Sequence, residues 1–194
     1  MNFIIIRDKL KKVLSTVGAA VQDHGQLPIL GSILLETKDN SIVLSGTNLE
    51  IAITASTLGK VITPGSIALP YASFSSLIDT IRTERITLEN KAQGLEIATD
   101  NYRATLQTLP VQDFPIIPKL KQDTAYIDVE TQVFRSALAH VLLATQFSEL
   151  RQELNVVLLS VGTDAFRIVG TDSFRLSEYT IPGNHYSVHG ISEG

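Results

Sequence analysis

The sequence of 194 residues contains no cysteine and no tryptophan, and aromatic residues make up only 6% of it. Without cysteine the chain cannot form disulfide bonds, thiolate zinc sites or iron–sulfur clusters, and it has no cysteine nucleophile. No apolar run reaches the roughly 18 residues of a membrane-spanning helix. The first seven residues carry their charge after the apolar run, unlike a signal peptide. These absences fit a reducing compartment, and we expect a cytoplasmic protein.

A large excess of charge is also lacking, because 16 Lys and Arg residues stand against 20 Asp and Glu residues, a net charge of −4. This balance excludes a protein that holds nucleic acid by strong positive charge alone. The hydrophobic content of 44% is too high for a disordered chain. The length is enough for one or two domains with a buried core.

A repeat with a period of 124 residues is present. Without gaps, Leu30–Leu35 aligns with Leu154–Leu159, and Gly46-Thr47-Asn48 aligns with Gly170-Thr171-Asp172. The same shift places Leu10, Val13, Leu14 and Val17 on Phe134, Ala137, Leu138 and Val141. The repeat predicts a duplicated domain.

The apolar spacing predicts three amphipathic helices, over Leu10–Val17, Phe74–Ile81 and Phe134–Val141. Short β-like runs with turn signals separate these helices. Residues 3–57 and 66–108 each have the order β-α-β-β-β, and residues 127–180 have it again. The sequence therefore predicts an α+β fold with a complete domain at 1–121 and the first half of a second domain at 125–194. Half a sheet would expose edges and an apolar helix face, which favours association.

Motifs for catalysis and metal binding are not found in the sequence. The four histidines are His24, His140, His185 and His189, and no ligand set surrounds them. There is no nucleophile elbow, no phosphate-binding glycine loop and no selected pair of carboxylates. We predict no catalytic residue, no metal and no cofactor.

Two features remain. Arg7, Lys9, Lys11 and Lys12 place cations at the start of the first predicted helix, where they oppose the helix dipole. They could face phosphates, or they could form an ordinary solvated surface. The segment Gly170–Leu176 combines Phe174, Arg175 and Leu176 at a chain reversal. It could anchor a partner, or it could be a tight turn with Phe174 in the core.

Four segments in order carry a family resemblance. They are Leu27-Pro28-Ile29-Leu30-Gly31, Leu44–Ile51, Leu109-Pro110 with Asp113-Phe114-Pro115, and Gly170–Leu176. Together they resemble the β sliding clamp of bacterial DNA polymerase III, from Met1 to about Pro182. The resemblance implies tandem domains of two β-α-β-β-β halves, with helices lining a hole and sheets outside. It also implies a non-catalytic processivity factor that encircles double-stranded DNA as a head-to-tail homodimer.

The resemblance further implies sequence-independent DNA contacts from hole-lining residues, which here are Arg7, Lys11, Lys12, His24, Arg82 and Arg135. It implies that short peptide motifs of the DNA polymerase III catalytic subunit and the clamp loader bind an apolar groove. The second-domain wall of that groove would consist of Leu154, Thr171, Ser173, Phe174, Arg175 and Leu176. The edge strand with Arg103, Ala104 and Leu106 would pair with a neighbouring subunit.

Departures from the family pattern leave alternatives open. Val156 stands where glycine is usual, the loop Ser148–Glu153 is short, and the pattern is lost from His189 onward. We therefore expect a truncated clamp without its third domain. One alternative is a peptide-binding module with no DNA role or a non-functional clamp fragment, and another is an enzyme on a similar scaffold, which no motif supports.

Overall fold

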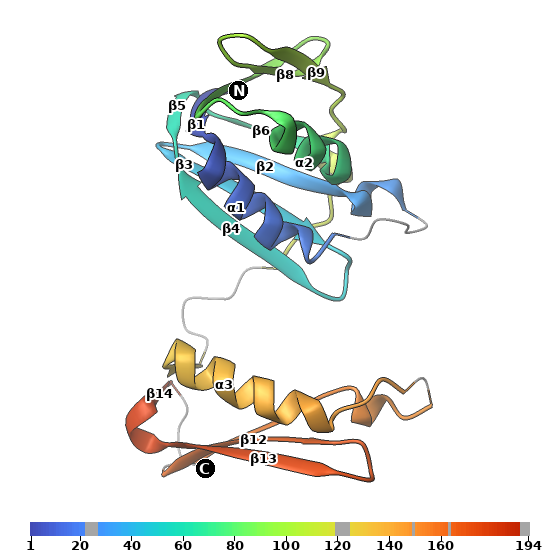
Figure 1. Cartoon of the computed structure of the whole chain (residues 1–194), viewed down its shortest axis with the longest axis vertical. Coiled ribbons are helices and arrows are strands. Elements are labelled where there is room, and N and C mark those ends of the chain that lie inside the picture. Colours follow the sequence, from blue (N-terminus) through green and yellow to red (C-terminus); the bar gives the residue numbers. More distant parts are fainter. Residues whose placement is uncertain (22–26, 119–124, 149, 163, 191–194) are drawn as a thin grey trace. The chain divides into compact units, whose positions relative to one another are not determined.

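The structure is a computed structural model that describes residues 1–21, 27–118, 125–148, 150–162 and 164–190. The chain forms two compact units, Met1–Pro118 (unit 1) and Lys119–Gly194 (unit 2) (Figure 1). The α+β fold predicted from the sequence is confirmed.

Unit 1 contains two similar halves whose strands are interleaved. Its elements are β1 (Asn2–Ile6), α1 (Arg7–Gly18), β2 (Ser32–Lys38), β3 (Ser41–Thr47), β4 (Ala52–Leu58), β5 (Lys60–Thr63), β6 (Gly65–Pro70), α2 (Tyr71–Thr80), β7 (Arg85–Lys91), β8 (Gly94–Ala98) and β9 (Arg103–Leu106). The two antiparallel sheets have the orders β4-β3-β2-β6 and β5-β1-β7-β8-β9. Each half thus contributes its first strand to the sheet of the other half.

The helices of unit 1 lie side by side on one face of the four-stranded sheet (Figure 1). The predicted stripe of α1 is confirmed, because Leu10, Val13, Leu14 and Val17 are all buried. On α2, Phe74 and Ile78 are buried, whereas Ile81 lies just past the end of the helix and is buried there. These side chains join apolar residues of both sheets in one core, which ties the two halves together.

Unit 2 repeats the first half of unit 1. Its elements are β10 (Tyr126–Val129), α3 (Thr131–Val141), β11 (Leu158–Val161), β12 (Ala165–Thr171), β13 (Leu176–Pro182) and β14 (Tyr186–His189). The sheets are β11-β12-β13 and β10-β14. The helix α3 packs on β12 and β13 (Figure 1), over a small core of Ala137, Val141, Phe166, Ile168 and Ile181. The last described strand, Tyr186–His189, pairs antiparallel with β10.

The 124-residue repeat is confirmed at the level of single contacts. A Cβ atom added to Gly46 would lie 2.8 Å from a methyl group of Val17, and one added to Gly170 would lie 2.8 Å from the same methyl group of Val141. Each glycine therefore lets a strand approach the end of its helix closely. The two strands also have matching bounds, because β12 is β3 displaced by the repeat.

Candidate functional site

The loop between β12 and β13 is held by the side chain of Asp172. Its Oδ1 accepts hydrogen bonds from the backbone N–H groups of Phe174 (2.9 Å) and Arg175 (2.7 Å), and its Oδ2 accepts one from Nε of Arg175 (3.0 Å). The Thr171 hydroxyl donates to the carbonyl of Arg175 at 2.7 Å. This network fixes a tight turn in which Ser173 has a left-handed φ of 74°, a conformation that local hydrogen bonds must stabilise in a residue with a side chain.

The donors around Asp172 also set its protonation. The backbone N–H of Arg175, followed by that of Phe174, holds the pKa of the Asp172 carboxyl below its ordinary value. Hydrogen bonds to the charged form favour that form. The side chain is almost completely buried, and burial by itself would raise its pKa, so the hydrogen bonds are what favour the charged carboxylate at the centre of the turn.

Unit 1 has the same loop between β3 and β4. There Oδ1 of Asn48 accepts from the backbone N–H groups of Glu50 (3.0 Å) and Ile51 (2.8 Å), and Leu49 has a φ of 76°. The Thr47 hydroxyl donates to the carbonyl of Ile51, as Thr171 does to that of Arg175. The Gly-Thr-Asn and Gly-Thr-Asp motifs therefore specify the same turn geometry. The side chain that accepts the two backbone N–H groups is a neutral amide in unit 1 and a carboxylate in unit 2.

The turn directs large side chains into solvent. Phe174 is 92% exposed and Leu176 is 68% exposed, and Ser173 and Arg175 are also exposed. The alternative in which Phe174 lies in the core is wrong, because the turn is closed by polar groups and has no need of an aromatic ring. An exposed aromatic beside an arginine is typical of residues that anchor a partner protein.

A second segment contacts this turn through a residue that the sequence analysis missed. Nη1 of Arg151 donates to Oγ of Ser173 at 3.0 Å. This second segment begins at Ser148 and ends at Asn155. The side-chain amide of Asn155 links its two ends, because it donates a hydrogen bond to the carbonyl of Ser148 and accepts one from the Ser148 N–H. The segment carries the half-buried Leu154 in a short helix, Gln152–Leu154. The only sequence signal for this contact is an arginine in the short loop before Leu154.

The predicted groove wall thus consists of two connected segments. The turn provides Thr171, which is half-buried, together with Ser173, Phe174, Arg175 and Leu176, and the neighbouring segment provides Leu154. Phe147, just before that segment, and Leu150 within it are largely exposed as well. We define the exposed apolar side chains Phe147, Leu150, Phe174 and Leu176 as the apolar patch of unit 2.

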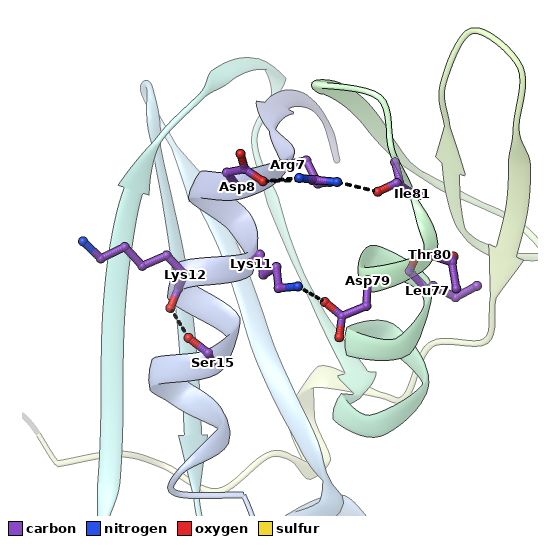
Figure 2. A network of polar contacts seen from close by, with 9 residues as sticks. All are labelled: Arg7, Asp8, Lys11, Lys12, Ser15, Leu77, Asp79, Thr80 and Ile81. Carbon is purple, nitrogen blue, oxygen red and sulfur yellow. Dashed lines mark hydrogen bonds and ion pairs between the residues drawn. The ribbon is translucent and has the colours of Figure 1, made fainter.

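The basic residues of α1 have different surroundings (Figure 2). The guanidinium of Arg7 donates to Oδ1 of Asp8 (2.6 and 2.9 Å) and to the carbonyl of Ile81 (2.9 Å), so it ties the start of α1 to the end of α2. Nζ of Lys11 lies 2.7 Å from Oδ1 of Asp79 on α2. The side chain of Lys12 points away from both pairs, and within the described part of the chain no acidic group lies within ion-pair distance of it.

The other predicted DNA-facing residues do not share one element. Arg135 is exposed on α3, at the position that repeats Lys11. Arg82 is exposed and lies two residues beyond the end of α2, so it is near that helix and not on it, and its contact with DNA stays a prediction. The helix ends there because Ile81 has extended backbone angles and turns into the core. His24 lies outside the described residues.

The predicted subunit-interface residues lie on an edge strand. Among the strands of the described residues, β9 is the last of its sheet and pairs with β8 alone. Arg103 and Thr105 are exposed on it, whereas Ala104 and Leu106 are half-buried. Its outer edge therefore presents backbone groups that another strand could pair with.

The histidines in the described residues have structural contacts. Nδ1 of His185, just before β14, lies 2.6 Å from a carboxylate oxygen of Glu130, just after β10, and Nε2 of His189 on β14 lies 3.3 Å from one of Asp128 on β10. His140 packs against the ring of Tyr179. Over the described ranges, no three His, Asp or Glu residues converge as a metal site would require.

Comparison with known proteins identifies the family. Residues 1–118 match the family described as DNA polymerase III beta subunit, N-terminal domain. The chain belongs to this family. Among curated proteins, it is 29% identical to the beta sliding clamp of Escherichia coli K12 over 94% of this chain and 50% of that protein. It is 31% identical to the beta sliding clamp of Proteus mirabilis over 91% of this chain and 48% of that protein.

Solved structures of beta subunits have the same fold. The DNA polymerase III subunit beta of Pseudomonas aeruginosa matches with a TM-score of 0.86 and 26% identity, over 97% of this chain and 53% of that chain. The beta subunit of Streptococcus pyogenes matches with a TM-score of 0.88 and 25% identity, over 96% and 51%. This beta-subunit chain spans about half the length of the curated relatives that it matches. No helix in its described residues is long and apolar enough to cross a membrane.

Proposed function

We propose that this chain provides part of a DNA sliding clamp, a processivity factor that encircles duplex DNA and acts without catalysis in the cytoplasm. The observation that carries the proposal is the match of residues 1–118 to the beta-subunit family. In this proposal unit 1 is the complete first clamp domain and unit 2 belongs to the second. A net charge of −4 agrees with retention by topology instead of affinity, because a ring needs only weak phosphate contacts.

The DNA-facing residues in this proposal lie on the exposed side of α1 in unit 1 and, separately, on the exposed side of α3 in unit 2. Lys12 and Arg135 are the side chains best suited to touch phosphates, because both are exposed on helices. Lys11 can exchange its contact with Asp79 for a phosphate at little cost, since both side chains are more than half exposed. Arg7 instead positions the helix through its bonds to Asp8 and Ile81. His24 and Arg82 stay predictions for the same surface.

The apolar patch of unit 2, with Leu154, is proposed to receive short peptide segments of the DNA polymerase III catalytic subunit and the clamp loader. Phe174 and Leu176 can lose most of their water contact on binding, at roughly 25 cal/mol for each Å² of apolar surface buried. The Asp172 network holds the turn in place before the peptide arrives, which lowers the entropic cost of binding. The outer edge of β9, with Arg103, Ala104 and Leu106, is proposed to pair with a neighbouring subunit in the head-to-tail ring.

Retention on circular DNA tests the clamp. We expect a clamp that contains this chain, after loading by a clamp loader, to co-elute with nicked circular duplex DNA and to be released when the circle is cut. Salt of roughly 0.5 M should not remove it from the circle, because topology is not screened by ions. Equal retention on linear and circular DNA would contradict the proposal.

A peptide-binding module without a DNA role is the second candidate, and the 92% exposure of Phe174 favours it. Duplex titrations at several salt concentrations distinguish the two functions. Binding that weakens with salt supports the clamp, whereas peptide binding with no duplex binding supports the module.

A further inference from the structure

A cleft in unit 1 lies where residues of β1, β5 and β7 meet the start of α1. Its volume is about 750 Å³, which is within the range of pockets that hold small-molecule ligands. The charged residues that line it are Lys9, Lys60 and Arg85. Among the described residues no acidic side chain lines the cleft, so it carries three positive charges in a chain whose net charge is −4.

Strand pairing brings two of these cations to one face of the sheet. Lys60 on β5 is opposite Ile4, and Arg85 on β7 is opposite Ile6. Cross-strand partners have their side chains on the same face of a sheet. Ile5, between the two isoleucines, lies in the core. The cations and the isoleucines therefore share the face of the sheet that points away from the core.

The three cations of the cleft have no acidic partner in the described part of the chain. Ten Lys and Arg residues lie in residues 1–118, and four of them are within ion-pair distance of a carboxylate. Three of the other six are Lys9, Lys60 and Arg85, which are all exposed. An anion that enters the cleft thus meets cations that do not have to give up a carboxylate first.

The backbone of β1 adds a donor to the cleft. The N–H of Arg7 donates to the carbonyl of Glu84, on the β7 side of β1. Successive N–H groups of an extended strand point to opposite sides, so the N–H of Ile6 points to the β5 side. The pairing of β1 with β5 ends at Ile4 and Lys60. Over the described strands, the N–H of Ile6 therefore has no strand partner on that side, and it can donate to an anion.

Gly59 holds the wall of the cleft in place. A Cβ atom added to it would overlap Cδ1 of Ile42 and would lie 2.9 Å from the carbonyl oxygen of Ile4. The N–H of Gly59 donates to the carbonyl of Asn40 at 3.0 Å. The junction between β4 and β5 thus lies directly against β1 and the turn before β3. Lys60 is positioned beside the cleft before a ligand arrives, which lowers the cost of binding.

We propose that this cleft binds a small organic phosphate of the nucleoside di- or triphosphate class. Guanidinium and ammonium groups are common partners of phosphate oxygens, and several phosphate charges match three cations. The aliphatic side chains of Ile4, Ile6 and Leu58 line the same cleft and offer apolar surface to the rest of the ligand. The inference rests on unit 1 alone, so it stands or falls independently of the clamp function.

Isothermal titration calorimetry of the full chain with ATP, in buffer without magnesium, tests the site. Adenosine, which lacks the phosphates, should bind at least about 30-fold more weakly. Arg85→Ala and Lys60→Ala should each weaken ATP binding by about tenfold, because each removes a charge-assisted hydrogen bond. Both side chains are exposed, so both variants should fold.

Lys12→Ala is the matched control, because it removes a cation of α1 that does not line the cleft. It should change the affinity for ATP by less than about twofold, since an exposed charge outside the site contributes little. Equal losses in Lys12→Ala and Arg85→Ala would overturn the proposal, as would the absence of ATP binding by the unmodified chain.

Amide signals of the ¹⁵N-labelled chain locate the ligand and identify the source of the phosphates. ATP should shift the signals of Ile6, Gly59 and Lys60, and shifts confined to other residues would overturn the site. A short DNA duplex at the same phosphate concentration should shift these three signals less than ATP does. Larger shifts with the duplex would overturn the assignment to a free nucleotide and would make the cleft part of a DNA-binding surface.

Discussion

Asp172 and Asn48 occupy the same place in the two units, and the Oδ1 atom of each accepts two backbone N–H groups. Asp172 adds a charge and a bond to the Arg175 guanidinium. Comparison of Asn48 with Asp172 therefore distinguishes two contributions to the stability of the turn. One is the acceptor oxygen that closes the turn, and the other is the negative charge that strengthens it.

We expect Asp172→Asn to keep the turn and melt slightly below the unmodified chain, because Asn48 supports the same geometry. Asp172→Ala should melt lower than both, since it leaves the N–H groups of Phe174 and Arg175 without their acceptor. Circular dichroism melts at pH 7 measure the order. Equal melting temperatures for the asparagine and alanine variants would contradict it.

The stability of this turn should depend on pH. The folded pKa of Asp172 is lowered, so its stabilising effect is complete above the ordinary aspartate pKa and is lost as the pH falls through the lowered one. The difference in melting temperature between the unmodified chain and Asp172→Asn should therefore shrink below about pH 4. A difference that stays constant from pH 7 to pH 3 would show that the charge has no such role.

Phe174→Ala should weaken binding of a labelled peptide from the DNA polymerase III catalytic subunit by about tenfold. The fold should be unaffected, because the ring is almost fully exposed. Fluorescence anisotropy measures the affinity. Ile116→Ala, which removes an equally exposed apolar side chain from unit 1, is the control and should bind as the unmodified chain does. Undiminished binding by Phe174→Ala would remove the aromatic ring from the proposed site.

At the scale of elements, α1 and α3 rest on their sheets in the same way. In each unit a strand comes close to the end of the helix at a glycine, Gly46 beside Val17 and Gly170 beside Val141. The outer face of α1 carries lysines whose surroundings differ, with Lys11 paired to α2 and Lys12 directed away from that pair (Figure 2). The packing contacts thus use one face of α1, and Lys12 lies outside that face.

Gly170→Ala should destabilise unit 2 by about 1–3 kcal/mol, because overpacking forces the strand and the helix apart. The added Cβ atom would lie 2.8 Å from Val141 Cγ1 and 3.0 Å from the Val141 carbonyl oxygen. Gly46→Ala should have an effect of the same kind in unit 1. Thermal unfolding compares the two variants, and an unchanged melt for Gly170→Ala would contradict the close approach.

Lys12→Ala should weaken the binding of duplex DNA, and the loss of affinity should be similar for every DNA sequence. It should also reduce the slope of log affinity against log salt by about 0.9, the value for one lost phosphate contact. Lys38→Ala, an exposed lysine at the end of β2, is the control with unchanged binding. Binding by Lys12→Ala that matches the unmodified chain would place the DNA-facing surface elsewhere.

At the scale of the whole molecule, the two units differ in how much core they possess. Unit 1 joins two halves around one extended core, whereas the described core of unit 2 rests on five buried residues from one half. Apolar burial is the main stabilising contribution to folding. The two units should therefore differ in stability.

Limited proteolysis should cut unit 2 first and leave a resistant product that ends near Pro118. Local opening is easiest where few apolar contacts are buried. Mass spectrometry identifies the product, and Gly46→Ala is the control that should make the unit 1 product less resistant. Early cleavage inside unit 1 would contradict the difference between the cores.

Features that depend on near neighbours can be read from the sequence alone. The buried stripe of α1 and the Gly-Thr-Asn and Gly-Thr-Asp turns each follow from residues within a few positions of one another, and the 124-residue repeat is visible because these local patterns occur twice. Helical periodicity and side-chain hydrogen bonds to adjacent backbone groups are local, so they can be read without a partner. The four segments that resemble the clamp family are also short and local, so the candidate site could be predicted from them.

Features that depend on residues far apart in the chain became visible in the folded structure. In the structure, β1 joins the sheet of the second half of unit 1, and β6 joins the sheet of the first half. Lys11 pairs with Asp79, and Arg151 donates a hydrogen bond to Ser173. The structure also places Phe174 in solvent and leaves Leu159 half-exposed. Strand pairing and burial depend on which distant segment arrives at an edge or a face, and the pattern of a single strand does not specify that partner.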